Sequence, residues 1–195
     1  MPDRITDELL LERARRGEQA AFLLLYERHR EAIFRFSYRL LGSVELAEDI
    51  THDCFLSLIR RPEGFDPQRA TLRTYLYAAT RNLAMKVFRS QGRETAIDDL
   101  NEYPAVSRYE QPLHRLLDSE LATKVEEAVA DLPPLQREAL VLFEYEGLAL
   151  NEIAEVVGTD VGAVKSRLHR ARVRLRNSLS PYLNTDPEIV TLEQA

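Results

Sequence analysis

The sequence predicts an all-α protein made of two small helical domains joined by a flexible linker, the second containing a helix-turn-helix. Apolar side chains recur at helical spacing along most of the 195 residues, and no alternating pattern of useful length predicts a strand. Residues 91–112 lack that periodicity, are acidic, and contain one glycine and two prolines. Residues 150–176 combine a short helix, a glycine and a long basic helix.

These observations set the expected domain boundaries. We place the first domain at residues 1–92, an acidic linker at 93–119, the second domain at 120–183 and an acidic tail at 184–195. Both domains are long enough to enclose a core of their own.

Four helices are expected in the first domain. Asp7 to Arg16 predicts the first, which Gly17 closes, and residues 19–41 predict a long amphipathic helix that ends at Gly42. Ser43 suits the cap of a third helix, which runs to about Arg60. Proline and glycine in residues 61–70 predict a loop before a fourth helix at 71–90. The third helix is expected to turn inward Leu46, Ile50, Cys54, Phe55, Leu58 and Ile59.

The composition excludes several classes of protein. A single cysteine cannot form an internal disulfide framework, and its apolar neighbours favour a core position over a redox-active thiol. No apolar run is long enough to span a membrane, and charges interrupt the start of the chain, so we expect a cytoplasmic protein without membrane insertion. The four histidines are scattered and no nucleotide-binding or nucleophile motif occurs, so no metal, cofactor or enzymatic activity is predicted.

The second domain contains the most informative segment. Pro133 and Pro134 fit the start of a helix that continues to about Glu146, and Pro181 is expected to stop the last helix. Between them, small Ala154 allows two helices to cross closely, Gly158 permits a left-handed turn, and Val164 points back into the junction. The same three positions define a helix-turn-helix.

Charge is distributed in two basic islands within a chain of net charge −6. Residues 160–177 hold six basic and one acidic side chain, and residues 61–93 hold seven and two. A solvated helix ordinarily mixes the two signs, so the near absence of acids at 160–177 indicates a DNA-binding surface. In residues 71–93 aromatic side chains lie between the basic ones, as in surfaces that hold single strands. Core positions remain the favoured interpretation for Tyr77 and Phe88, and single-strand binding by this island alone stays open.

Three segments in the same order resemble one family. The start DELLLERARRGEQAAFLLLYERHREAIFRFSYRLLGSVELAEDITHDCFLSL, the helix TLRTYLYAATRNLAMKVFRSQGR and the segment LPPLQREALVLFEYEGLALNEIAEVVGTDVGAVKSRLHRARVRL are similar to extracytoplasmic-function sigma factors of the sigma-70 family. The resemblance covers roughly residues 7–180. It implies a promoter-specificity factor that binds core RNA polymerase and promoter DNA, with an anti-sigma factor as a further partner.

The resemblance also implies roles for individual residues. The helix after the turn would read the −35 element through Lys165, Ser166, Arg167, Arg170 and Arg174. The other island would bind and open the −10 element through Phe65, Arg73, Tyr75, Arg81, Asn82, Lys86 and Arg89. The clamp helices of the polymerase would be contacted by Glu48, Asp49, His52 and Asp53, and the acidic linker would thread the polymerase channel.

The chain departs from the family pattern at three places. Tyr75 stands where tryptophan is usual, Lys86 where aspartate is common, and His52 with Asp53 in place of a frequent Gln-Glu pair. The alternative function is a stand-alone helix-turn-helix regulator with an N-terminal sensor or dimerisation domain, which would bind its operator without polymerase. Such a regulator has no need of the basic island at residues 71–93.

Overall fold

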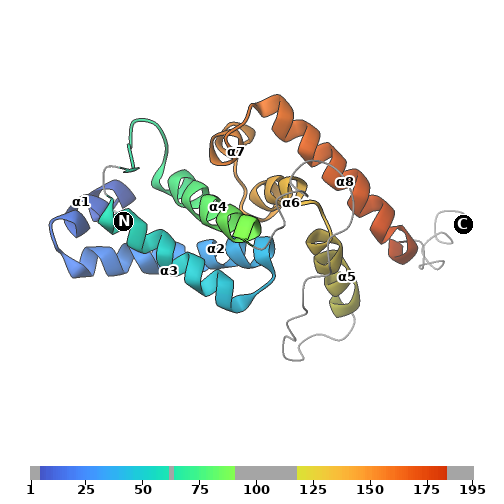
Figure 1. The fold of residues 1–195 in the computed structure, drawn as a ribbon, viewed down its shortest axis with the longest axis horizontal. Coiled ribbons are helices and arrows are strands. Elements are labelled where there is room, and N and C mark those ends of the chain that lie inside the picture. The colour runs from blue at the N-terminus through green and yellow to red at the C-terminus, as the bar shows by residue number, and fades with distance from the viewer. Residues whose placement is uncertain (1–4, 62–63, 91–117, 184–195) are drawn as a thin grey trace, which may run out of the picture.

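The structure is a computed structural model, and it describes residues 5–61, 64–90 and 118–183. These residues form helices and turns and contain no strand. The helices lie in two groups placed side by side, with α4 on the boundary between them (Figure 1). The all-α prediction is therefore confirmed for the described part of the chain.

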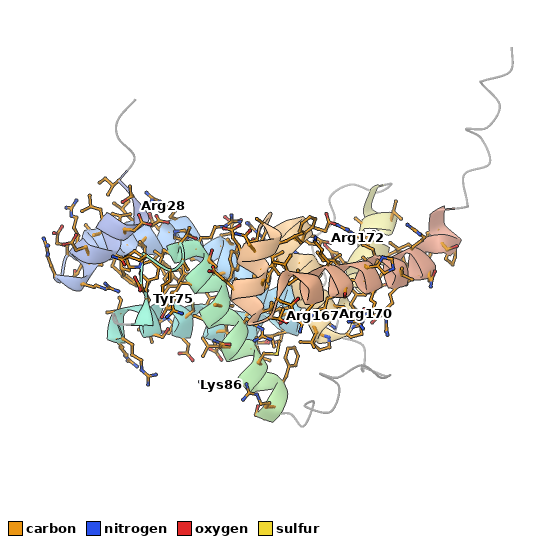
Figure 2. All side chains as sticks on the ribbon, turned by 90° about the horizontal axis from the view of Figure 1, so that it is seen from above. Arg28, Tyr75, Lys86, Arg167, Arg170 and Arg172 are labelled. Carbon is orange, nitrogen blue, oxygen red and sulfur yellow. The ribbon has the colours of Figure 1, made fainter. Side chains whose placement is uncertain are left out.

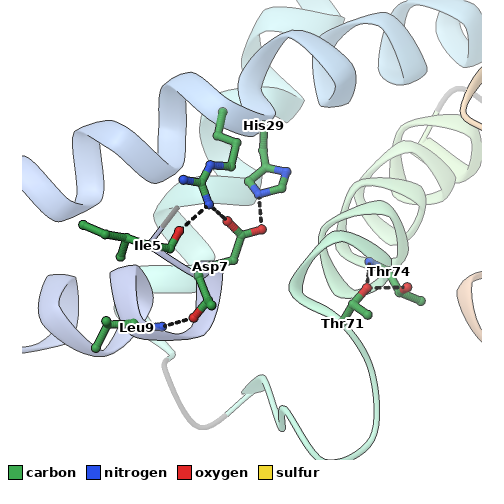
Figure 3. Close-up of polar contacts among 8 residues, drawn as sticks. Ile5, Asp7, Leu9, His29, Thr71 and Thr74 are labelled. Atoms are coloured by element: carbon green, nitrogen blue, oxygen red, sulfur yellow. Dashed lines mark hydrogen bonds and ion pairs between the residues drawn. The ribbon is translucent and has the colours of Figure 1, made fainter. Parts of the chain in front are cut away.

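The first group comprises α1 (Asp7–Arg15), α2 (Gln19–Leu41), α3 (Val44–Arg60) and α4 (Leu72–Ser90). Ser43 caps α3 by accepting a hydrogen bond from the Leu46 N–H at 3.2 Å, as the sequence predicts. Thr71, expected to be the first residue of α4, instead stands before it and accepts a hydrogen bond from the Thr74 N–H at 3.1 Å (Figure 3). Gly42 ends α2 in the left-handed conformation with φ 69°.

The core of the first group is built where α2, α3 and α4 meet. Cys54 is fully buried, and its Sγ lies 3.4 Å from the hydroxyl oxygen of Thr80 on α4, which confirms the expected core position. Burial raises the pKa of this thiol to about 11. The inward position expected for Ile59 is wrong: its side chain is exposed, because it lies about 100° around the helix from the completely buried Leu58.

Polar contacts join α1 to α2 (Figure 3). The carboxylate of Asp7 pairs with Arg28 and lies 2.7 Å from Nε2 of His29. The same arginine donates a hydrogen bond to the backbone oxygen of Ile5. Thr6 caps α1 through its side-chain oxygen. Together these bonds hold the start of the chain against the long second helix.

The second group comprises α5 (Asp118–Ala130), α6 (Pro134–Leu140), the π-helical segment η3 (Val141–Tyr145), α7 (Leu150–Val157) and α8 (Val161–Leu183). The helix that begins at Pro134 does continue to the residue before Glu146, but its last turns are π-helical, which the sequence pattern does not indicate. The expectation that Pro181 stops α8 is wrong. It lies in the last turn, where its missing N–H costs a single hydrogen bond.

The two groups pack directly against each other. The main contact is between α4 and α7, with smaller contacts from α2 to α6 and η3 (Figure 1). The buried apolar residues of both groups form one continuous cluster. Tyr77 and Phe88 of α4 belong to that cluster, which confirms them as core residues.

The segments between and after the groups fall mostly outside the described residues. The sequence assigns Asp118 and Ser119 to the linker, whereas both residues belong to α5. The rest of the expected linker, and the expected acidic tail at 184–195, lie outside the described residues. No helix in the described ranges has the length and apolar character that a membrane crossing requires.

Candidate nucleic-acid interface

The helix-turn-helix is formed by α7 and α8. Gly158 ends α7 with φ 68°, and Asp160 begins α8 by accepting a hydrogen bond from the Ala163 N–H at 2.9 Å. Val164 is completely buried and Ala154 nearly so, which puts both in the junction between the helices as the sequence predicts. The turn therefore fixes the direction in which α8 leaves the domain.

Most of the residues expected to read DNA lie on the outer face of α8. Exposed side chains there include Lys165, Ser166, Arg170 and Arg174. In Figure 2, Arg167 and Arg170 point toward one long edge of the molecule, where Lys86 also projects from the end of α4. Arg172 lies toward the other edge, where it pairs with Glu144 at 2.7 Å. One face of α8 thus gathers several exposed basic side chains.

Arg167 differs from its neighbours on α8. Its Nη1 lies 3.2 Å from Oε1 of Glu138, and its side chain is only 17% exposed. A guanidinium in such a pair has part of its hydrogen-bonding capacity already used. The structure therefore places Arg167 at the inner margin of the exposed basic face.

The residues expected on α4 divide between two stripes of that helix. Asn82, Lys86 and Arg89 are exposed. Arg73 and Arg81 are four residues either side of the buried Tyr77, and they form a stripe that faces the second group. The two stripes lie on different sides of α4, because each residue turns the helix by about 100°.

The loop before α4 holds the remaining two expected residues. Phe65 is buried and its ring lies edge-on to that of Tyr75, with 5.4 Å between the ring centroids. Tyr75 is partly buried. In this structure the two rings support the loop from within, and neither presents a fully open face for a base.

The residues expected to contact polymerase lie together on α3. Glu48, Asp49, His52 and Asp53 are all exposed. Their spacing of one and four residues places them on one side of the helix. They form an acidic surface on the face of α3 that is turned away from the core.

Two glutamates that the sequence does not single out join the groups. Glu138 is completely buried between Arg81, with Nε at 2.9 Å from Oε2, and Arg167. Burial raises the pKa of its carboxyl, although both arginines act in the opposite direction. Glu146 accepts a hydrogen bond of 2.6 Å from the hydroxyl of Tyr77, and its backbone oxygen accepts another from Arg73.

A buried arginine completes the contact. Nη1 of Arg137 donates to the backbone oxygen of Leu40 at 2.8 Å, and Nη2 donates to that of Leu132 at 3.0 Å. Leu40 lies near the C-terminal end of α2, so the positive charge of Arg137 also interacts favourably with the negative end of that helix dipole. The available sequence signal is that Arg137 and Glu138 directly precede the apolar run at residues 139–143, and that Glu146 follows shortly after it.

No group of three or more histidine, cysteine, aspartate or glutamate side chains within the described ranges is arranged to hold a metal ion. The chemistry offered by the two basic faces is electrostatic. Guanidinium and ammonium groups bind phosphates, and exposed amides such as that of Asn82 can reach base edges.

Comparison with known proteins follows the same division of the chain. The family model of sigma-70 region 2 matches residues 25–94, and the model of sigma-70 region 4 matches residues 122–175. The first covers α2 to α4, and the second covers the helix-turn-helix and the helices before it.

Similar proteins extend over nearly the whole chain. The ECF RNA polymerase sigma factor SigE of Mycolicibacterium smegmatis is 33% identical over 172 residues, which are 85% of this chain and 65% of that one. The ECF RNA polymerase sigma-E factor of Haemophilus influenzae is 29% identical over 94% of this chain and 100% of its own. The sigma factor RpoE of Bartonella quintana, solved with the anti-sigma factor NepR, has a TM-score of 0.64 and 25% identity, covering 82% of this chain and 96% of that one.

Proposed function

The chain belongs to the extracytoplasmic-function type of the sigma-70 family and is an RNA polymerase sigma factor, and on that premise we propose how its residues direct core polymerase to promoters. Residues 1–92 act as the region 2 domain and residues 120–183 as the region 4 domain. The observation that carries this assignment is the presence of two separate basic faces, on α4 and on α8, in one acidic chain.

The region 4 domain reads the −35 element with α8. Lys165, Ser166, Arg170 and Arg174 are exposed on the helix that follows the turn, where a recognition helix enters the major groove. Arg167 contributes from the inner margin of that face. Phosphate contacts set the register and give an affinity that falls with salt, and contacts to base edges give specificity.

The region 2 domain binds and opens the −10 element with α4 and the loop before it. Asn82, Lys86 and Arg89 form one exposed part of this surface, and the exposed Arg73 with the largely buried Arg81 forms a second part. Tyr75 and Phe65 supply aromatic faces for an extruded base. Because their rings pack on each other in this structure, base capture requires the loop to rearrange.

The remaining contacts are with proteins. The acidic face of α3, with Glu48, Asp49, His52 and Asp53, docks on the clamp helices of polymerase, and the linker at 93–119 follows the polymerase channel. An anti-sigma factor is a further partner, supported by the solved complex of the similar RpoE. The protein acts in the cytoplasm and is not itself an enzyme, because polymerase supplies the catalysis.

A reconstituted transcription assay tests this function. Purified protein is added to core polymerase, and genomic fragments retained by the complex serve as templates for run-off transcription. Promoter-dependent transcripts are expected only when both proteins are present. Tight operator binding by the chain alone, with no association to core polymerase, would instead support the stand-alone regulator.

Two variants test the division of labour between the helices. Lys165→Ala should weaken binding to −35 duplex DNA and reduce the magnitude of its salt dependence by about one unit of slope. Asn82→Ala should leave duplex binding unchanged and lower open-complex formation, followed by permanganate reactivity of unpaired thymines. Equal loss of both steps in both variants contradicts the assignment.

A further inference from the structure

The stripe of α4 that contains Arg73, Tyr77 and Arg81 has an occupant already, which is the second helical group. Each of the three residues contacts a glutamate of that group. The two glutamates, Glu138 and Glu146, are almost completely buried. The contact between the groups is therefore made through the arginines that the proposed function assigns to the −10 element.

Resting on that function, we propose that Glu138 and Glu146 form a lock in which the region 4 domain binds both arginines, with Arg73 exposed at the edge of the contact and Arg81 largely covered, and keeps the −10 strand from them until the domains separate. Carboxylates and phosphates both satisfy a guanidinium through two oxygens, so Glu138 and a DNA phosphate compete for Arg81, and the backbone oxygen of Glu146 competes with phosphate for Arg73. The stripe is one surface with two mutually exclusive partners.

The hydroxyl of Tyr77 indicates that the contact between the two groups is specific. Tyr77 packs edge-on against Phe36, with ring centroids 5.2 Å apart, which phenylalanine would do equally well. Its hydroxyl donates across the boundary to the carboxylate of Glu146 at 2.6 Å, beside Arg73 of the same helix. Arg39 of α2 approaches the same carboxylate, with Nη1 at 3.6 Å from Oε1.

The chemistry of the lock also makes it reversible. Burying a carboxylate and a guanidinium removes both from water, and the attraction between them about offsets that cost. When the domains separate, Arg81 and Glu146 regain water as a partner, and DNA phosphates become available to the arginines. Binding of polymerase or DNA to the open form then shifts the equilibrium by mass action.

Energy transfer between two dyes measures the opening. Glu27→Cys on α2 and Asn177→Cys on α8 are exposed labelling sites in the two groups. Cys54 can remain, because it is buried and its raised pKa of about 11 keeps the thiol protonated. Binding of a fluorescein-labelled single-stranded DNA oligonucleotide of mixed sequence is followed by anisotropy on the unlabelled full-length protein.

Tyr77→Phe and Glu146→Gln are the variants that weaken the lock. Neither changes a residue assigned to bind DNA. Because apparent affinity is scaled by the fraction of open protein, each should lower energy transfer and raise affinity for the oligonucleotide about five- to tenfold. Tyr26→Phe removes a hydroxyl within the first group, and Glu144→Gln removes an exposed charge that pairs within the second. Both controls should behave as the wild type.

Two results overturn the lock. Energy transfer that stays unchanged in both variants shows that these contacts do not hold the domains together. A fall in energy transfer without a gain in DNA binding shows that the contact does not mask the stripe. Failure of the wild-type protein to bind core polymerase is a separate outcome. It would reject the proposed function itself, on which the lock rests.

Discussion

Helices α4 and α8 each carry a row of basic residues, but their charges meet different surroundings. On α8, Lys165 and Arg174 are exposed, whereas Arg167 pairs with the buried Glu138 and Arg172 with the exposed Glu144. On α4, the exposed Arg73 and the largely buried Arg81 contact the second group, whereas Asn82, Lys86 and Arg89 are exposed on another side of the helix. The difference shows that a basic residue cannot be assigned a partner from its charge alone. The same arginine can serve a phosphate or a buried carboxylate.

The contrast between paired and exposed basic residues would not hold if Arg167 contributed no more to stability than the exposed residues of α8. Arg167→Ala leaves the buried Glu138 with Arg81 as its remaining cation, so we expect the free energy of unfolding to fall by about 2–3 kcal/mol. Lys165→Ala, a matched exposed control, should change it by less than about 0.5 kcal/mol. Urea unfolding of both variants measures the two values. Equal effects would place Arg167 among the solvated residues.

A second pair of variants sharpens the contrast within α4. Arg81→Ala should lower the free energy of unfolding by about 2–3 kcal/mol, because its guanidinium is only 19% exposed and bonds to the buried Glu138 through two nitrogens. Arg89→Ala should change it by less than about 0.5 kcal/mol, because Arg89 lies on the open stripe. Urea unfolding monitored by far-ultraviolet circular dichroism distinguishes the two. Similar values would mean that the stripes do not differ.

The buried carboxylate gives a smaller, pH-dependent effect. Because the pKa of Glu138 is raised in the folded protein, the fold binds this proton more tightly than the unfolded chain does. Its contribution to stability is then complete below the ordinary value of 4.5 and is lost as pH rises through the raised value. Wild type should therefore gain stability relative to Glu138→Gln as pH falls from about 8 to about 5, by less than about 1.4 kcal/mol per pH unit. If the stability of the wild type relative to Glu138→Gln fell as the pH was lowered, this prediction would be contradicted.

The smallest expected effect concerns Cys54, which reports whether α4 stays packed on α3. Its Sγ lies 3.6 Å from the backbone oxygen of Leu76 on α4. If opening separates the groups without moving α4 from the first group, Glu146→Gln should leave the rate of thiol reaction with a disulfide reagent within about twofold of wild type. A much faster reaction would mean that α4 itself loosens.

Local features of this fold can be predicted from sequence because their causes are local. Ser43 caps a helix and Gly158 ends one through bonds to residues a few positions away. Pro181 is expected to stop α8, but the helix continues past it to Leu183, so a proline near a helix end does not fix the last residue. Ile59 belongs to an apolar pair with Leu58, and which of the two faces the core is decided by how α3 packs against its neighbours.

The contact between the groups could not be predicted in the same way. Arg81 and Glu138 are separated by 57 positions, and nothing near either residue specifies the other. Sequence therefore identifies the charged residues of both basic islands but not their partners. The roles assigned to individual residues toward DNA and polymerase remain predictions.

The π-helical segment Val141–Tyr145 determines the direction in which the side chain that follows it, Glu146, points. A π turn holds about one residue more than an α turn, so it behaves as a one-residue insertion absorbed within a continuous helix. Deleting one residue there would restore regular winding and rotate Glu146 by about 100° about the helix axis. The glutamate would then point away from Tyr77. The contact between the two groups therefore depends on the number of residues in this helix as well as on the charges that it brings together.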